Sequence, residues 1–252
     1  MNGFVQQGPG GRTSPQTLAR IGGILYLIII VGGGFSEMFV RARIIVSGDA
    51  AATAANILSN ELLWRVGIAG EFLMLVCTVA LALILYVLLR PVSRDLALLA
   101  LLFNLISIAV EATNELRLLL SLLPLRSADS LGAFDPGQLQ ALSYLTTQSY
   151  GYGFGISLIF FGFECLVLAV LIYRSGYLPR TIGVLMGVAG VCYLVNMFAL
   201  ILSPSLADVL FPTAMLPVLL GEGSLALWLL AKGVDVPKWR ARAGPAALGS
   251  GA

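Results

Sequence analysis

The sequence predicts an all-α, polytopic integral membrane protein, a six-helix transmembrane bundle with short outer interfacial helices. Hydrophobic residues make up 58% of the 252 residues and charged residues 11%, whereas soluble domains are roughly 45–50% apolar. The mean hydropathy is +0.94. Six apolar stretches each reach the roughly 20 residues that a helix needs to cross a hydrocarbon core of about 30 Å.

These stretches are long enough for helices and lack the strict alternation of barrel strands. They cover residues 21–40, 62–89, 96–120, 151–173, 181–202 and 211–230. The first stretch continues past its glycines to Val40 without a cleavage pattern, which favours an uncleaved span over a signal peptide. The chain then divides into a polar N-terminal segment (1–17), a six-span transmembrane domain (18–232) and a basic, then disordered tail (233–252).

Basic residues collect on one side of the predicted membrane. Ten of the fifteen Lys and Arg residues belong to that side: Arg12, Arg20, Arg90, Arg94, Arg174, Arg180, Lys232, Lys238, Arg240 and Arg242. The positive-inside rule makes this side cytoplasmic. We therefore expect a protein of a cytoplasmic (inner) membrane with both termini inside, and aromatic belts that include Trp64 and Tyr150 outside and Trp239 inside.

Two longer connections on the outer side, residues 41–61 and 121–150, predict short helices at the interface. Asp49 precedes an alanine-rich run and is typical of an N-cap. Asp135 followed by Pro136 is typical of an N-cap with a first-turn proline. A third outer connection, residues 203–210, is expected to be a short link.

The third span carries most of the polar residues. Asn104, Ser107, Glu111, Asn114 and Glu115 recur at spacings of three and four, which places them on one helix face. An ionised residue at mid-membrane costs at least about 2.5–3.5 kcal/mol. We therefore expect this face to point into the bundle.

Acidic residues of other spans are expected to join this face in one outward-facing cavity. The candidate ligand-binding residues are Glu71, Glu111, Glu115, Asn114, Glu164 and Glu222. Carboxylates gathered in one place repel one another, so at least one should take up a proton or bind a cation.

A purely structural role is the alternative for these acids. Arg41 follows Glu37 by four residues, and Arg117 lies close to Glu115 in the sequence. Arg65 likewise follows Glu61 by four residues. Such acids can be neutralised at the outer rim, whereas Glu71, Glu111 and Glu164 have no obvious arginine of their own.

Glycines predict close helix contacts. Gly183 and Gly187 form a G-x-x-x-G pattern, a feature of packed transmembrane helices and a candidate contact for a homo-oligomer. Gly221 and Gly223 flank Glu222, with Pro217 one turn earlier, so a kink or an unwound turn is expected there.

Several functions are excluded by what the sequence lacks. The chain contains no histidine, which removes Ser-His catalysis and histidine-ligated zinc or haem. No nucleotide-binding motif occurs, and the three cysteines have no ligand spacing. We expect no cofactor and no metal, and a net charge of +2 gives no reason to expect nucleic acid.

Two motifs carry a family resemblance. One is Glu37-Met-Phe-Val-Arg-Ala-Arg with Gly48-Asp-Ala-Ala-Ala-Thr-Ala-Ala-Asn-Ile; the other is Phe160-Phe-Gly-Phe-Glu-Cys with Leu171-Ile-Tyr-Arg-Ser-Gly-Tyr-Leu-Pro-Arg180. They resemble the bacterial membrane proteins of the domain of unknown function 4386 family, over about residues 18–230. The resemblance implies a six-helix prokaryotic membrane protein without assigned chemistry. It also implies a histidine at the position of Glu164 and an acid near Asn196, so a role that needs that histidine is in doubt here.

The function expected from these patterns is a binding or transport module for a small cationic or proton-linked solute in the lipid bilayer. An intramembrane enzyme that acts on lipid or isoprenoid through two carboxylates remains an alternative, and it predicts a lateral groove and a divalent metal. An accessory or sensor subunit with only structural polar contacts is the other alternative.

Overall fold

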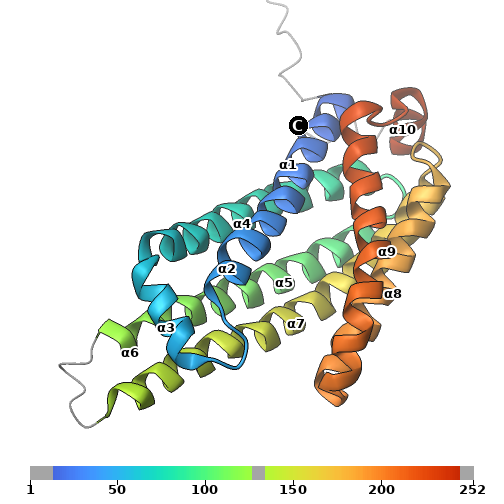
Figure 1. The fold of residues 1–252 in the computed structure, drawn as a ribbon. Coiled ribbons are helices and arrows are strands. Elements are labelled where there is room, and N and C mark those ends of the chain that lie inside the picture. Colours follow the sequence, from blue (N-terminus) through green and yellow to red (C-terminus); the bar gives the residue numbers. More distant parts are fainter. Residues whose placement is uncertain (1–13, 127–133, 245–252) are drawn as a thin grey trace, which may run out of the picture.

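The computed structural model describes residues 14–126 and 134–244, and every regular element in these ranges is helical (Figure 1). The elements are α1 (Pro15–Phe35), η1 (Ser36–Arg41), α2 (Ala42–Ile44), α3 (Ala50–Ser59), α4 (Glu61–Leu89), α5 (Arg94–Leu120), α6 (Leu122–Arg126), α7 (Pro136–Ser175), α8 (Arg180–Leu202), α9 (Pro204–Ala231) and α10 (Val236–Ala243). All six predicted spans are confirmed as long apolar helices, so the chain is a multi-pass membrane protein.

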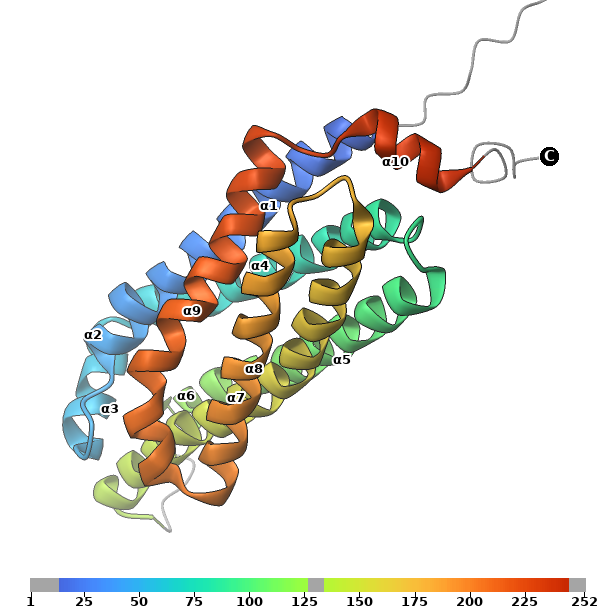
Figure 2. The same ribbon diagram turned by 90° about the vertical axis from the view of Figure 1, so that its right-hand side faces the viewer.

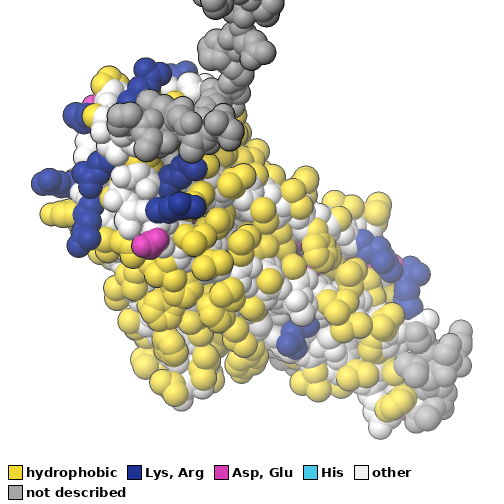
Figure 3. Space-filling model, turned by 180° about the vertical axis from the view of Figure 1, so that it is seen from behind, with side chains coloured by type: hydrophobic (Ala, Val, Ile, Leu, Met, Phe, Trp, Pro, Cys, Tyr) yellow, Lys and Arg dark blue, Asp and Glu magenta, His cyan; other side chains and the backbone are white. Residues whose placement is uncertain are grey.

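The long helices form a closed ring in chain order. α1 packs on α4, α4 on α5, α5 on α7, α7 on α8 and α8 on α9, and α9 returns to α1 (Figures 1 and 2). The short connections from α4 to α5, from α7 to α8 and from α8 to α9 favour such antiparallel neighbours. A space-filling view shows apolar side chains over the middle of the molecule and basic ones toward its two ends (Figure 3), as contact with a bilayer requires.

Two ends of the bundle can be distinguished. The termini end is where α1 begins and α10 lies, and the α3 end is the opposite one (Figure 1). At the α3 end, α7 extends beyond the predicted span, because it runs for 40 residues without a break, about 60 Å at 1.5 Å per residue. Asp135 caps it as predicted, in a capping box with Gln138. The expected short interfacial helix after Asp135 is therefore wrong, since these residues are the first turns of α7.

A small second core lies at the α3 end, where α3 and α6 pack on the extension of α7. Asp49 caps α3 as predicted, accepting a hydrogen bond from the Ala52 amide at 2.8 Å. Trp64 is 1% exposed in this core and donates its indole N–H to the Leu118 carbonyl at 3.1 Å. Trp64 and the buried Tyr150 therefore do not belong to a lipid-facing belt, because both have partners inside the bundle.

Glycines allow the backbones of neighbouring helices to approach within the chain. A Cβ on Gly183 would lie 2.9 Å from the Ala169 carbonyl oxygen of α7, and one on Gly187 would lie 3.4 Å from the Ala169 Cβ. The close packing is therefore between α8 and α7 of one chain, and a homo-oligomer through these glycines stays a prediction.

The sixth span differs from its prediction at two places. α9 begins at Pro204, so the expected link of residues 203–210 is almost wholly helical. The helix also continues without an unwound turn past Glu222. A Cβ on Gly221 would lie 2.8 Å from the Leu185 carbonyl oxygen, so this glycine serves the close approach of α8 and not an opening of α9.

At the termini end, the residues after the sixth span fold back on the bundle. Trp239 of α10 is buried and donates to the Leu88 carbonyl at 2.8 Å. Gln16 donates to the Lys232 carbonyl at 2.8 Å and accepts from the Val234 amide at 3.0 Å. The first part of the expected basic, then disordered tail thus contains α10, which ends at Ala243, and residues 245–252 lie outside the described part.

Candidate functional site

The site is built on an irregular turn of the first span. Residues 36–41 form a π-helical turn in which the Ala42 amide donates to the Glu37 carbonyl, five residues back. Such turns shift the side chains that follow and often mark functional positions. Here the turn directs Arg41 into the bundle, where the residue is 9% exposed.

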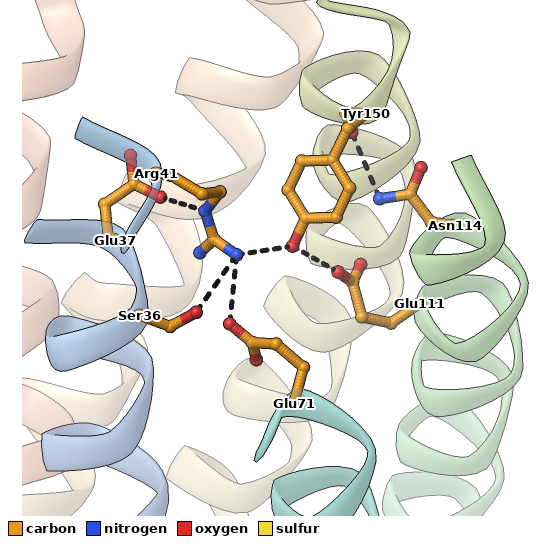
Figure 4. A network of polar contacts seen from close by, with 7 residues as sticks. All are labelled: Ser36, Glu37, Arg41, Glu71, Glu111, Asn114 and Tyr150. Atoms are coloured by element: carbon orange, nitrogen blue, oxygen red, sulfur yellow. Dashed lines mark hydrogen bonds and ion pairs between the residues drawn. The ribbon is translucent and has the colours of Figure 1, made fainter. Parts of the chain in front are cut away.

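Arg41 pairs with two carboxylates. Its Nε donates to Glu37 at 2.6 Å and its Nη1 to Glu71 of α4 at 3.0 Å (Figure 4). The pair with Glu37 was expected from the sequence. Glu71 was expected to lack an arginine, and that is wrong, because the π-helical turn brings Arg41 across to α4.

Tyr150 of α7 links this ion pair to the third span. The Arg41 Nη1 donates to the Tyr150 hydroxyl at 3.3 Å, and the guanidinium carbon lies 5.0 Å from the centre of the ring. The same hydroxyl donates to Glu111 of α5 at 3.0 Å (Figure 4). One hydroxyl therefore connects the arginine to a carboxylate that has no ion pair among the described residues.

The polar face of the third span points into the bundle, as predicted. Glu111 also accepts from the Ser157 hydroxyl at 2.8 Å, and Ser107 donates to the Ser157 carbonyl at 2.9 Å. Asn114 donates to the Tyr150 carbonyl at 3.1 Å. All three contacts are with α7, so the polar face is the seam between α5 and α7.

Glu115 differs from the other acids. It is 0% exposed, and neither carboxylate oxygen has a hydrogen-bond partner in the described part of the chain. Glu71, Glu111 and Arg41 are the charged groups that act on it, and the Tyr150 hydroxyl lies nearby. The expected pairing of Glu115 with Arg117 is wrong. The Arg117 side chain is exposed and donates to the Ser149 hydroxyl at 3.0 Å.

We call these residues the Arg41 network: Ser36, Glu37, Arg41, Glu71, Glu111, Asn114, Glu115, Tyr150 and Ser157. Four of them are carboxylates and one is a base. A recess of about 180 Å³, counting its open mouth, touches Ser36, Arg41 and Glu71. The rim pair of Glu61 with Arg65, at 2.6 Å, was predicted and lies outside the network.

Glu164 and Glu222 do not belong to the network. Glu164 accepts from Asn104 at 2.6 Å in the same seam, nearer the termini end. Glu222 accepts from the Tyr193 hydroxyl at 2.5 Å, between α8 and α9. A single cavity that contains all the candidate acids is therefore wrong, because the two glutamates point to helix interfaces away from Arg41. A ligand role for any candidate residue stays a prediction.

Three members of the network, Ser36, Tyr150 and Ser157, were not identified as site residues from the sequence. Ser36 is one serine among many, and Tyr150 was taken for an interfacial aromatic. A signal for Tyr150 did exist, since Tyr150, Ser157 and Glu164 recur every seven residues. That spacing puts the three on one face of a helix, the face that meets α5.

Comparison with known proteins identifies the family of this chain. The family model described as a domain of unknown function (DUF4386) matches residues 21–233. The chain belongs to the DUF4386 family. An uncharacterised protein of Archaeoglobus fulgidus is 30% identical over 166 residues, which is 66% of this chain and 83% of that protein. No solved structure matches the chain.

Proposed function

We propose that this DUF4386 protein binds a small cation or a proton at the Arg41 network, as a binding or transport module. The observation that carries the proposal is Glu115, a carboxylate fully removed from solvent with no hydrogen-bond partner on either oxygen among residues 14–126 and 134–244. A buried ionised carboxylate without a partner costs several kcal/mol. A bound proton or cation removes that cost.

The charge balance of the network supports the same conclusion. Arg41 is already shared by Glu37 and Glu71, and Glu111 and Glu115 form no ion pair within the part of the chain that the structure describes. Tyr150 and Ser157 satisfy Glu111 with hydrogen bonds and add no positive charge. The network therefore has an excess of acid that a positive ligand would neutralise.

The size of the recess limits the ligand. The space inside it is only about 10 Å³, about what one water molecule requires. A proton or a small monovalent cation fits these limits. A bulky organic cation does not fit without movement of η1 or α4.

We further propose that the protein lies in a prokaryotic cytoplasmic membrane with both termini inside. The basic residues of the termini end favour this orientation. The Arg41 network would then lie in the outer half of the bilayer and take its ligand from the external side.

Uptake by purified protein in lipid vesicles tests the proposal. The probes are sodium, potassium, methylammonium and protons, the last followed with a trapped pH-sensitive dye. We expect saturable uptake of at least one probe, reduced about tenfold or more in Glu115→Gln and Glu111→Gln, since loss of 1.4 kcal/mol of binding is a factor of ten.

Glu61→Gln is the matched control, because Glu61 pairs with Arg65 and Arg126 at the rim and not with the network. It should leave uptake unchanged. Wild-type vesicles that take up none of the probes would contradict transport, and equal uptake by wild type, Glu115→Gln and Glu111→Gln would contradict a ligand site here.

The accessory-subunit alternative also has an observation in its favour. It predicts that the acids form ion pairs, and Glu37, Glu61 and Glu71 do so. This alternative does not explain why the Glu115 carboxylate is fully buried. Recovery of one reproducible membrane partner with the full chain, combined with no uptake of any probe, would favour it over the module.

A further inference from the structure

A second polar cluster lies in the α5–α7 seam, closer to the termini end than the Arg41 network. Its centre is Glu164, which is 3% exposed and accepts a hydrogen bond of 2.6 Å from the Asn104 Nδ2. The Asn104 Oδ1 is also buried, and it has no hydrogen-bond partner in the described ranges. A buried carbonyl acceptor without a donor requires an explanation.

A protonated carboxyl group supplies the missing donor. A carboxamide presents an N–H donor and a C=O acceptor side by side. A carboxylic acid presents the complementary pair, a C=O acceptor and an O–H donor. With a proton on Glu164, its O–H can donate to the Asn104 Oδ1 while the Asn104 N–H donates back. An ionised Glu164 has no hydrogen to give and leaves the Oδ1 unsatisfied.

The surroundings of Glu164 add no positive charge. The titratable groups that face it are Glu222 from α9 and Cys165 from its own helix, with Tyr193 of α8 and Tyr26 of α1 beside them. Neither Glu164 nor Glu222 takes part in any ion pair in residues 14–126 and 134–244. A carboxylate buried in an apolar bundle without a base beside it favours a bound proton.

A narrow slot lies beside this carboxyl group. It measures about 200 Å³ with its mouth and is lined by Glu164 and apolar side chains of α4, α5 and α7, among them Leu85, Leu89 and Ala97. Leu89 and Ala97 flank the connection between α4 and α5, so the slot lies toward the termini end. The Arg41 recess lies toward the α3 end.

We propose that Glu164 is a proton-binding site, a carboxylic acid paired with Asn104, which exchanges its proton through this slot and is separate from the Arg41 network. No other ion is required, and the proton comes from and returns to water at the termini end. Because none of these residues belongs to the Arg41 network, the inference does not depend on the function proposed for that network.

Infrared spectroscopy of the full chain in lipid vesicles tests the protonation state directly. We expect the wild type minus Glu164→Gln difference at neutral pH to show loss of a protonated carboxyl C=O band. Loss of an ionised carboxylate band instead would overturn the proposal. Glu37→Gln is the control: its carboxylate is 64% exposed and ion-paired, so only the ionised band should fall.

Asn104→Leu provides a second variant that retains Glu164, in case the first does not fold. Loss of the amide should shift the same C=O band to higher frequency, because the carboxyl group loses its hydrogen bonds. A spectrum that changes only in the ionised carboxylate region would overturn the proposal. Glu164→Gln should also keep the wild-type thermal stability, since a glutamine amide can donate to the Asn104 Oδ1 as the acid does.

Access through the slot has its own measurement. After transfer to heavy water, the C=O band of Glu164 should shift as the proton exchanges. Ala100→Leu, which places a larger side chain in the slot wall, should slow that shift several-fold, whereas Gly33→Ala, where an added Cβ meets nothing within 4 Å, should not. Equal exchange in wild type and Ala100→Leu would show that the slot is not the route.

Discussion

Arg41 and Glu71 lie thirty residues apart in the sequence and form an ion pair of 3.0 Å between η1 and α4. Their side chains are 11% and 14% exposed. A pair this buried is stabilising only while both partners are present, because either charge alone would remain in an apolar surrounding.

Arg41→Met is therefore expected to destabilise the protein by about 3–5 kcal/mol, the cost of leaving buried charges without their partner. Equilibrium unfolding in mixed micelles with increasing SDS measures the change. Arg126→Met is the matched control, since Arg126 is 58% exposed in its pair with Glu61 and exposed pairs contribute about 0–1 kcal/mol. Equal effects of the two substitutions would show that the buried Arg41–Glu71 pair contributes no more to stability than the exposed pair of Arg126.

Tyr150→Phe removes the hydroxyl that accepts from Arg41 and donates to Glu111. We expect the free energy of unfolding to fall by about 1–3 kcal/mol, because the Glu111 carboxylate loses a hydrogen-bond donor inside the bundle. Uptake of the probe cation in vesicles should fall as well.

Tyr144→Phe serves as the comparison for that substitution. Its hydroxyl accepts from the Gly48 amide at 2.7 Å, on the same helix but outside the network. Uptake should stay at the wild-type level. If both tyrosine variants lower uptake equally, the effect comes from the extension of α7 and not from the Arg41 network.

Gly23→Ala should separate α1 from α9. An added Cβ would overlap the Leu230 amide nitrogen and approach the Ala226 carbonyl oxygen to 2.8 Å, and overpacking of this kind typically costs about 1–3 kcal/mol. Gly33→Ala on the same helix meets no atom within 4 Å. It should stabilise α1 by up to about 1 kcal/mol through helix propensity. Thermal unfolding of both variants measures the difference, and a neutral Gly23→Ala would contradict the close α1–α9 contact.

The proposed orientation predicts which residues reagents reach from each side. The experiment uses a chain whose three native cysteines are replaced by alanine. Ala51→Cys, at an exposed position of α3, should react with a membrane-impermeant maleimide in intact cells. Lys238→Cys, at the termini end, should react only after the membrane is opened. The reverse pattern would place the Arg41 network on the cytoplasmic side.

The sequence by itself determined the class and the spans of this protein. Hydrocarbon thickness sets a minimum helix length, so the apolar runs could be counted and bounded before any contact was known. The caps at Asp49 and Asp135 were equally local, since each depends on a side chain and an amide three residues away. The polar face of the third span also followed from spacing alone.

Tertiary structure decided which partners these residues meet. A π-helical turn directs Arg41 to Glu71, a heptad on α7 brings Tyr150 to Glu111, and α9 carries Glu222 away to Tyr193. The G-x-x-x-G face contacts α7 of its own chain for the same reason. Spacing fixes the face of a helix on which a residue lies, but only the packing of the ring decides what that face contacts.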